Sequence, residues 1–157
     1  RQGIRGMVVR PSLIWGHGGC LTIANFFESA RKTGSVCYIG RGLNLYSSVH
    51  VDDLCTLFQL AVDRGVDGHL YHAVSGETNF RTIAQAVAKQ LGVDARSVSL
   101  SEAMEIWDKF TALIGMSVCS RSRSPLARKE LGWAPSAERL DILDEVSHPS
   151  FISGDDD

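Results

Sequence analysis

The chain has 157 residues, of which 44% are hydrophobic and 22% are charged, with only 4 prolines. These values are those of one ordinary soluble globular domain and exclude a disordered segment. The 16 Lys and Arg residues against 18 Asp and Glu residues leave a formal net charge of −2, which argues against a protein that binds nucleic acid or a membrane surface through bulk charge.

Strand and helix patterns alternate in the first part of the chain. Residues 6–11 form a short apolar run that ends at a proline, which predicts a buried strand followed by a loop at 15–19. Thr22 is expected to cap a helix that reaches about Lys32. Two further extended segments are expected at 36–39 and 46–51.

The later part of the chain is predicted to be mostly helical. The spacing of Leu54, Leu57, Phe58, Ala61 and Val62 predicts a helix that faces the core. Strands are expected at 69–74 and 98–100, and the tail from residue 145 is expected to be frayed. Each expected helix begins on a capping residue, namely Asp52 or Asp53, Thr78 or Asn79, Ser101, and Ser124 followed by Pro125. The fold class is therefore α/β with parallel pairing, and no linker divides the chain into two domains.

The cysteines and the apolar runs indicate a cytoplasmic protein. Cys20, Cys37, Cys55 and Cys119 form no C-x-x-C pair and no dense disulfide framework. We interpret them as four buried thiols in a reducing compartment. No apolar run approaches the roughly 18 residues that a membrane span needs, and no secretory signal pattern opens the chain.

Self-contained catalytic motifs are missing from the sequence. Neither G-x-G-x-x-G, nor the phosphate loop, nor the nucleophile elbow G-x-S-x-G is present. His69 and His72 lie three apart on an expected strand, so they point to opposite faces and make a poor metal site. The cluster at residues 121–124, R-S-R-S, can hold a phosphate through its arginine forks. A solvated loop before a capped helix explains that cluster as well.

Four segments form an ordered set. Residues 10–16 read R-P-S-L-I-W-G, residues 49–54 read V-H-V-D-D-L, residues 71–74 read Y-H-A-V before a helix, and residues 128–135 read R-K-E-L-G-W-A-P. In this order they resemble elements of the extended and atypical short-chain dehydrogenases/reductases, also called the NAD-dependent epimerase/dehydratase family. The resemblance covers about residues 4–144.

The resemblance implies the C-terminal part of a Rossmann-type NAD(P)-binding fold, its last parallel strands, together with a small, mostly helical substrate-binding lobe. On this view residues 1–144 are the C-terminal half of an epimerase/dehydratase-like domain, and NAD or NADP binds in the full-length parent. The Gly-rich turn and the catalytic Y-x-x-x-K pair would precede Arg1. The three tyrosines of this chain are followed four positions later by Gly42, His50 and Ser75, so no catalytic residue is assigned here.

The same resemblance suggests the binding residues. Pro11, Ser12 and Leu13 correspond to the segment that contacts the nicotinamide carboxamide. His17 and Gly18 would line the substrate mouth, and Tyr46 and His50 are candidate pocket residues. Sugar-nucleotide members carry R-D where this chain has Tyr46 and Ser47. Because Tyr46 cannot grip a diphosphate, we expect a smaller or less anionic small-molecule substrate, such as a carbonyl compound.

Two hypotheses follow for function. In the first, the chain is the C-terminal portion of an NAD(P)-dependent oxidoreductase or epimerase. The chain would be inactive alone, and the full-length parent enzyme is either a monomer or a homodimer. In the second, it is a non-catalytic remnant lobe that acts as a binding or interaction module. Neither hypothesis involves a metal, nucleic acid or a membrane.

Overall fold

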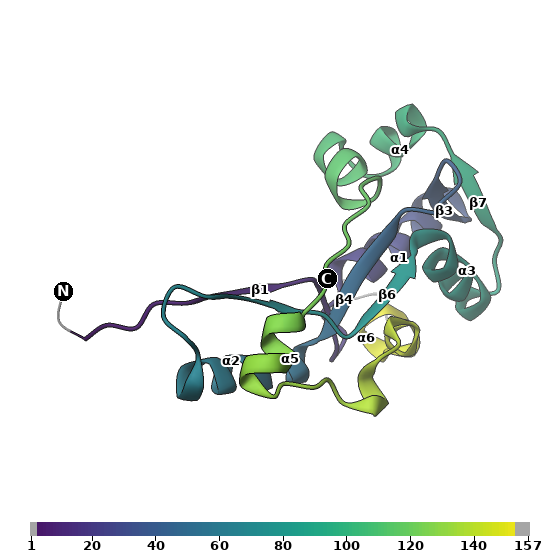
Figure 1. The fold of residues 1–157 in the computed structure, drawn as a ribbon. Helices are drawn as coiled ribbons and strands as arrows, with labels where there is room; N and C mark the ends of the chain where they lie inside the picture. The colour runs from purple at the N-terminus through teal and green to yellow at the C-terminus, as the bar shows by residue number, and fades with distance from the viewer. Residues whose placement is uncertain (1–2, 153–157) are drawn as a thin grey trace. The chain divides into compact units, whose positions relative to one another are not determined.

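The computed structural model describes residues 3–152, and these fall into two compact units, each considered by itself (Figure 1). The first unit holds residues 3–16, 47–77 and 121–142, and the second holds 17–46, 78–120 and 143–152. No linker marks the division, because the chain passes repeatedly from one unit to the other.

Parallel strands build the first unit. Strand β1 (Val8–Pro11) pairs in parallel with β5 (Leu70–Ala73), with Val8 opposite Leu70 and Pro11 opposite Ala73. Strand β2 (Leu13–Trp15) pairs in parallel with β4 (Leu45–His50), and β6 (Gly76–Asn79) completes a sheet of order β2-β4-β6. The α/β class with parallel pairing is confirmed.

Two helices and a tryptophan close the core of this unit. Helix α2 (Val51–Arg64) and helix α5 (Pro125–Leu131) contribute to one buried cluster. Trp133 is buried, and its indole Nε1 donates a hydrogen bond of 2.9 Å to the carbonyl of Asp53. The buried members of the cluster are Val49, Leu54, Leu57, Ala61, Tyr71, Ala73, Ala127, Leu131 and Trp133.

The second unit packs helices around a two-stranded parallel pair. Strand β3 (Val36–Ile39) pairs with β7 (Ala95–Val98), as Figure 1 shows. Phe26 and Phe80 meet edge to face inside this unit, with ring centroids 5.9 Å apart. Its helices are α1 (Leu21–Thr33), α3 (Phe80–Leu91), α4 (Leu100–Ile106), the π-helix Thr111–Gly115 and α6 (Pro149–Ile152).

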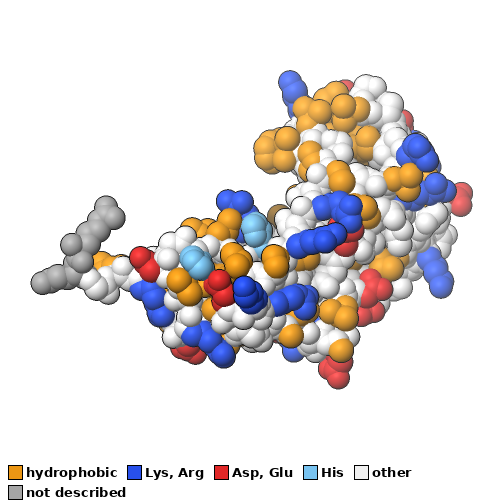
Figure 2. Space-filling model, in the orientation of Figure 1, with side chains coloured by type: hydrophobic (Ala, Val, Ile, Leu, Met, Phe, Trp, Pro, Cys, Tyr) orange, Lys and Arg blue, Asp and Glu red, His pale blue; other side chains and the backbone are white. Residues whose placement is uncertain are grey.

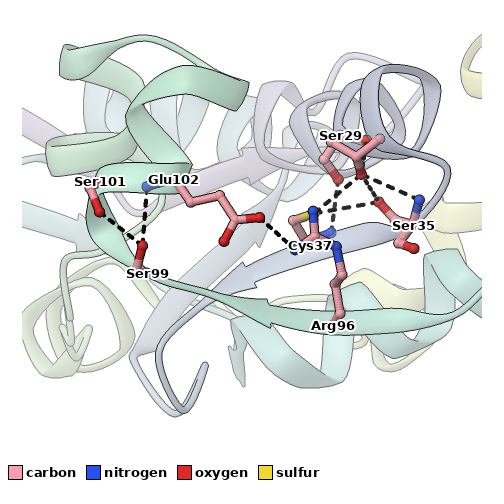
Figure 3. A network of polar contacts seen from close by, with 8 residues as sticks. Ser29, Ser35, Cys37, Arg96, Ser99, Ser101 and Glu102 are labelled. Atoms are coloured by element: carbon pink, nitrogen blue, oxygen red, sulfur yellow. Dashed lines mark hydrogen bonds and ion pairs between the residues drawn. The ribbon is translucent and has the colours of Figure 1, made fainter.

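Several expected helix starts are corrected. Helix α1 begins after Cys20 rather than at Thr22, which is buried within the helix. Helix α2 takes His50 as its cap, since the His50 ring Nδ1 accepts the Asp52 N–H at 3.2 Å, so the two aspartates lie in the first turn instead. Figure 3 shows Ser99 at the start of α4, where its hydroxyl accepts the Glu102 N–H at 3.1 Å. The predicted cap, Ser101, lies two residues further on, as the second residue of α4.

Other helix starts are confirmed, and glycines end three of the helices. Asn79 caps α3 by accepting the Thr82 N–H at 2.9 Å, and Gly34, Gly92 and Gly132 end their helices in the left-handed conformation. Pro125 opens α5 at its first turn, although the Ser124 hydroxyl donates to the carbonyl of Val74 instead of capping the helix.

Exposure overturns some of the apolar predictions. Val8 in β1 is 54% exposed, because only β5 borders that strand within residues 3–152, so the strand is not buried as expected. Phe58 and Val62 are 47% and 67% exposed, which makes the buried stripe of α2 narrower than its spacing implied. The helix expected after Ser101 ends at Ile106 and is followed by a separate π-helix.

The cysteines and the tail also differ from expectation. Cys20 and Cys37 are buried, but Cys55 and Cys119 are exposed, so the prediction of four buried thiols holds for two of them. Phe151 in α6 is 7% exposed and stacks on Phe27 at 5.5 Å. The prediction of a frayed tail is therefore wrong for residues 145–152. The rest of that tail lies outside the described residues. Within the described part of the chain, no helix is both long and apolar enough to cross a membrane.

Candidate functional site

The first unit contains a cleft of about 690 Å³. Its walls come from two segments, the one that joins β5 to β6 and the one that leads into α5. The lining residues are Ser47, Val74, Ser75, Gly76, Glu77, Arg121, Ser122, Arg123, Ser124, Pro125 and Arg128. A volume of this size is typical of small-molecule sites.

Serine hydroxyls hold the two segments in place. The Ser122 N–H donates to the Ser47 hydroxyl at 2.9 Å, and that hydroxyl donates in turn to the Ser122 carbonyl at 3.3 Å. On the facing segment, the N–H and the hydroxyl of Ser75 both donate to the Ser48 carbonyl, at 2.8 and 3.2 Å. These bonds replace regular secondary structure and keep the backbone ordered around the cleft.

Gly76 allows a close approach of two backbone segments. A Cβ atom at this position would lie 2.4 Å from the carbonyl oxygen of Leu140. That separation is far inside van der Waals contact, so a side chain here would force the wall of the cleft to shift.

Arginines supply the charge of the cleft. The Arg121 guanidinium donates to both oxygens of Glu77, from Nε at 2.7 Å and from Nη2 at 2.9 Å. This hydrogen bond lowers the pKa of Glu77, and the positive charge of Arg123 acts in the same direction. Arg128 lies over the Trp133 ring, 5.8 Å from its centroid. Three cations therefore face one carboxylate among the charged residues that line the cleft.

The arginine-serine segment lines the cleft. The sequence left residues 121–124 open between a phosphate-holding cluster and a solvated loop before a capped helix. The structure places all four on the wall of the cleft, with Arg121 and Arg123 exposed. Figure 2 shows Lys and Arg side chains gathered over α5 and the segment that leads into it. The R-S-R-S pattern was the sequence signal for this wall of the cleft. The cleft itself forms only with the β5–β6 segment, which lies more than forty residues earlier in the chain.

The predicted cofactor residues lie at the carboxyl end of the β1–β5 pair. Pro11 is the last residue of β1 and lies opposite Ala73, the last residue of β5. The N–H and the hydroxyl of Ser12 both donate to the Ala73 carbonyl, at 3.2 and 2.8 Å. Leu13 begins β2 opposite Ser48 and is half-buried. The segment thus turns the chain from one parallel sheet into the next.

The predicted substrate residues are divided between the two units. His50 is buried in the first unit, where its ring meets that of Trp15 edge to face at 4.6 Å. Tyr46 belongs to the second unit and stacks on Phe80 at 5.7 Å. His17 and Gly18 also belong to the second unit, and the Gly18 N–H donates to the Glu145 carboxylate at 2.8 Å. None of the seven predicted binding residues lines the arginine cleft.

Two curated fungal proteins resemble the chain. An uncharacterised protein of Schizosaccharomyces pombe is 33% identical over 141 residues, which make up 88% of this chain and 47% of that protein. An uncharacterised protein of Saccharomyces cerevisiae is 28% identical over 148 residues, 92% of this chain and 48% of that protein. The chain therefore spans about half the length of the curated relatives it matches. No family model matches it.

Solved structures of epimerases and dehydratases share the fold. A dTDP-glucose 4,6-dehydratase from Streptomyces venezuelae, solved with NAD, matches with a TM-score of 0.63 at 20% identity, over 93% of this chain and 42% of that one. The fold is that of the C-terminal part of these Rossmann-like enzymes. UDP-glucose 4-epimerase from Thermotoga maritima matches with a TM-score of 0.66 at 19% identity, over 94% of this chain and 45% of that one. An ADP-heptose 6-epimerase from Helicobacter pylori gives 0.67 at 12% identity, over 95% and 44%.

Proposed function

We propose that this chain is the C-terminal portion of an NAD(P)-dependent oxidoreductase or epimerase, and that residues 1–144 form half of its epimerase/dehydratase-like domain. In this role the chain contributes contacts to the nicotinamide side and to a small-molecule substrate. The observation that carries the proposal is the fold match, which covers nearly all of this chain but less than half of each matched enzyme. The four ordered sequence motifs support the same assignment.

The carboxyl end of the β1–β5 pair fits a nicotinamide cofactor by its position. Ligands of parallel α/β sheets bind outside the carboxyl ends of the strands, and Pro11 and Ala73 end their strands side by side. Both donors of Ser12 are directed to the Ala73 carbonyl. Pro11 and the apolar side chain of Leu13 would therefore face the cofactor, while Ser12 holds the turn. When bound, the nicotinamide accepts or returns a hydride.

The substrate residues remain part of the proposal. His17, Gly18, Tyr46 and His50 would border the substrate in the complete enzyme. Proton transfer by a Y-x-x-x-K pair has to come from outside these 157 residues, since none of the three tyrosines is followed by a lysine at the fourth position. The chain alone therefore positions ligands without carrying the acid or base of the reaction.

The reading frame that encodes the chain tests this proposal. The complete transcript should carry, upstream of these residues, a Gly-rich turn after a strand and a Y-x-x-x-K pair at family spacing. A transcript with neither motif would contradict the proposed parent enzyme and favour an interaction module instead.

A further inference from the structure

We propose that the arginine cleft of the first unit is a binding site for the phosphoryl group of an organic phosphate, held by Arg121 and Arg123 with Glu77 as the competing anion. Nothing in the fold match assigns a ligand to this cleft. The proposal concerns binding by this chain and holds whether or not the chain serves a nicotinamide enzyme.

The donor set matches a phosphoryl group. Guanidinium groups present planar forks that fit phosphate oxygens in pairs. Arg121 already makes such a two-point contact, with the carboxylate of Glu77. A phosphoryl oxygen pair can take the place of that carboxylate without a change in the fork.

Arg123 provides the second cation. Its guanidinium has no hydrogen-bond partner among residues 3–152, although it lines the same cleft and lowers the pKa of Glu77 through its charge. Among the residues that line the cleft, Arg121, Arg123 and Arg128 are cations and Glu77 is the one carboxylate. A dianionic group suits this excess of lining cations.

The size of the cleft indicates that the phosphate belongs to a larger molecule. A volume of about 690 Å³ is well above that of a single ion and lies within the range of drug-sized ligand sites. The hydroxyls of Ser47, Ser75 and Ser124 already donate to backbone carbonyls, so the arginines are the main donors for the anion.

The cleft also bears on the charge of the ligands that this chain can hold. Tyr46 stands where sugar-nucleotide enzymes carry the arginine that contacts the diphosphate. That difference predicted a less anionic ligand. The structure offers cations from a different segment, at residues 121–123, where the sequence pattern alone was ambiguous. An anionic small molecule is therefore compatible with this chain.

Pyrophosphate, inorganic phosphate and acetate are the probes for this site, followed by amide chemical shifts of the protein. We expect saturable shifts at residues 74–77 and 121–125, with the tightest binding for pyrophosphate and the weakest for acetate. Equal affinity for all three probes, or shifts spread over the surface without saturation, would overturn the proposal.

Matched variants separate a site from general charge attraction. Arg121→Gln and Arg123→Gln should each raise the Kd for pyrophosphate about tenfold, as expected for one lost charge-assisted contact. Arg31→Gln changes the net charge equally but lies on an exposed position of α1, so it should leave the Kd unchanged. A similar loss in Arg31→Gln would reduce the effect to bulk charge and contradict a built site.

Glu77→Gln tests whether the bound anion replaces the Glu77 carboxylate. If the anion replaces this carboxylate, the variant should bind pyrophosphate several-fold more tightly, because the competitor is gone. Weaker binding in a variant that is folded by thermal melting would mean that Glu77 supports the site instead, and would contradict the proposed exchange.

Discussion

Arg121 and Glu77 form a two-point ion pair across the cleft, with N–O distances of 2.7 and 2.9 Å. The Arg121 side chain is nevertheless 57% exposed. Exposed ion pairs contribute at most about 1 kcal/mol to stability, because water screens them. We predict that Arg121→Gln lowers the free energy of unfolding by no more than that in urea titration. A loss above about 2 kcal/mol would give the pair a structural role that its exposure does not support.

The indole of Trp133 joins two segments of the first unit that are far apart in sequence. Trp133→Phe keeps an aromatic ring in the core but leaves the buried Asp53 carbonyl without its 2.9 Å donor. The Asp53 carbonyl stays in the hydrogen-bond ladder of α2, so the variant loses one buried hydrogen bond and some packed volume. Together these cost about 1–3 kcal/mol, and urea unfolding should show a loss of this size. Phe110→Ala, at a position that is 72% exposed, is the control and should change stability by less than about 0.5 kcal/mol. Equal effects of the two variants would contradict this view of the core.

Glu130 gives the first unit a sensitivity to acid. Hydrogen bonds from His69 at 2.9 Å and from the Tyr71 hydroxyl at 3.0 Å hold the pKa of Glu130 below its usual value of 4.5. A carboxyl whose pKa is lowered on folding contributes stability above its unfolded pKa, and this contribution is lost as the pH falls through the folded value.

The corresponding variant is Glu130→Gln. The Tm of this variant should lie below that of the unsubstituted 157-residue chain at about pH 6. The difference in Tm should shrink as the pH falls below about 4.5. Glu105→Gln, at an exposed position of α4, should show no such convergence. A Tm difference for Glu130→Gln that stays constant down to about pH 3 would rule out the proposed linkage.

The four thiols should divide into two classes of reactivity. Burial raises the pKa of Cys20 to about 11, and Cys37 is fully buried. Cys55 and Cys119 are exposed. Because the thiolate is the reactive form and needs access to the reagent, a disulfide reagent at about pH 8 should label two thiols in the folded chain and all four after unfolding. Rapid labelling of Cys20 in the folded chain, seen by peptide mass spectrometry, would contradict its burial.

Local chemistry explains which elements could be predicted. The cap at Asn79 and the proline at the start of α5 depend on neighbouring residues only, and both were predicted. Strands β2 and β6 were missed because they are defined by their places beside β4 in one sheet, and neither segment shows that neighbour in its own sequence. The exposure of Val8 depends on which strands border β1, and no local pattern contains that information.

The site was less predictable than the fold for the same reason. The cleft is lined by the segment after β5 and the segment before α5. In the sequence these two segments are separate loops, and nothing in either one indicates that they lie together. Arg121 forms its ion pair with Glu77, which is 44 positions away in the sequence. The residues chosen by family resemblance, such as Pro11 and Tyr46, lie in different units, so their roles stay predictions.

Cofactor binding tests the central claim most directly. NADH and NADPH should be titrated, with nicotinamide fluorescence as the signal, into the protein encoded by the complete reading frame and into the 157-residue chain alone. The longer protein should bind at least one of the two nucleotides saturably, and the chain alone should bind neither, because it carries the nicotinamide side without the Gly-rich turn. Tight binding by the chain alone, or no binding by the longer protein, would contradict the proposed function.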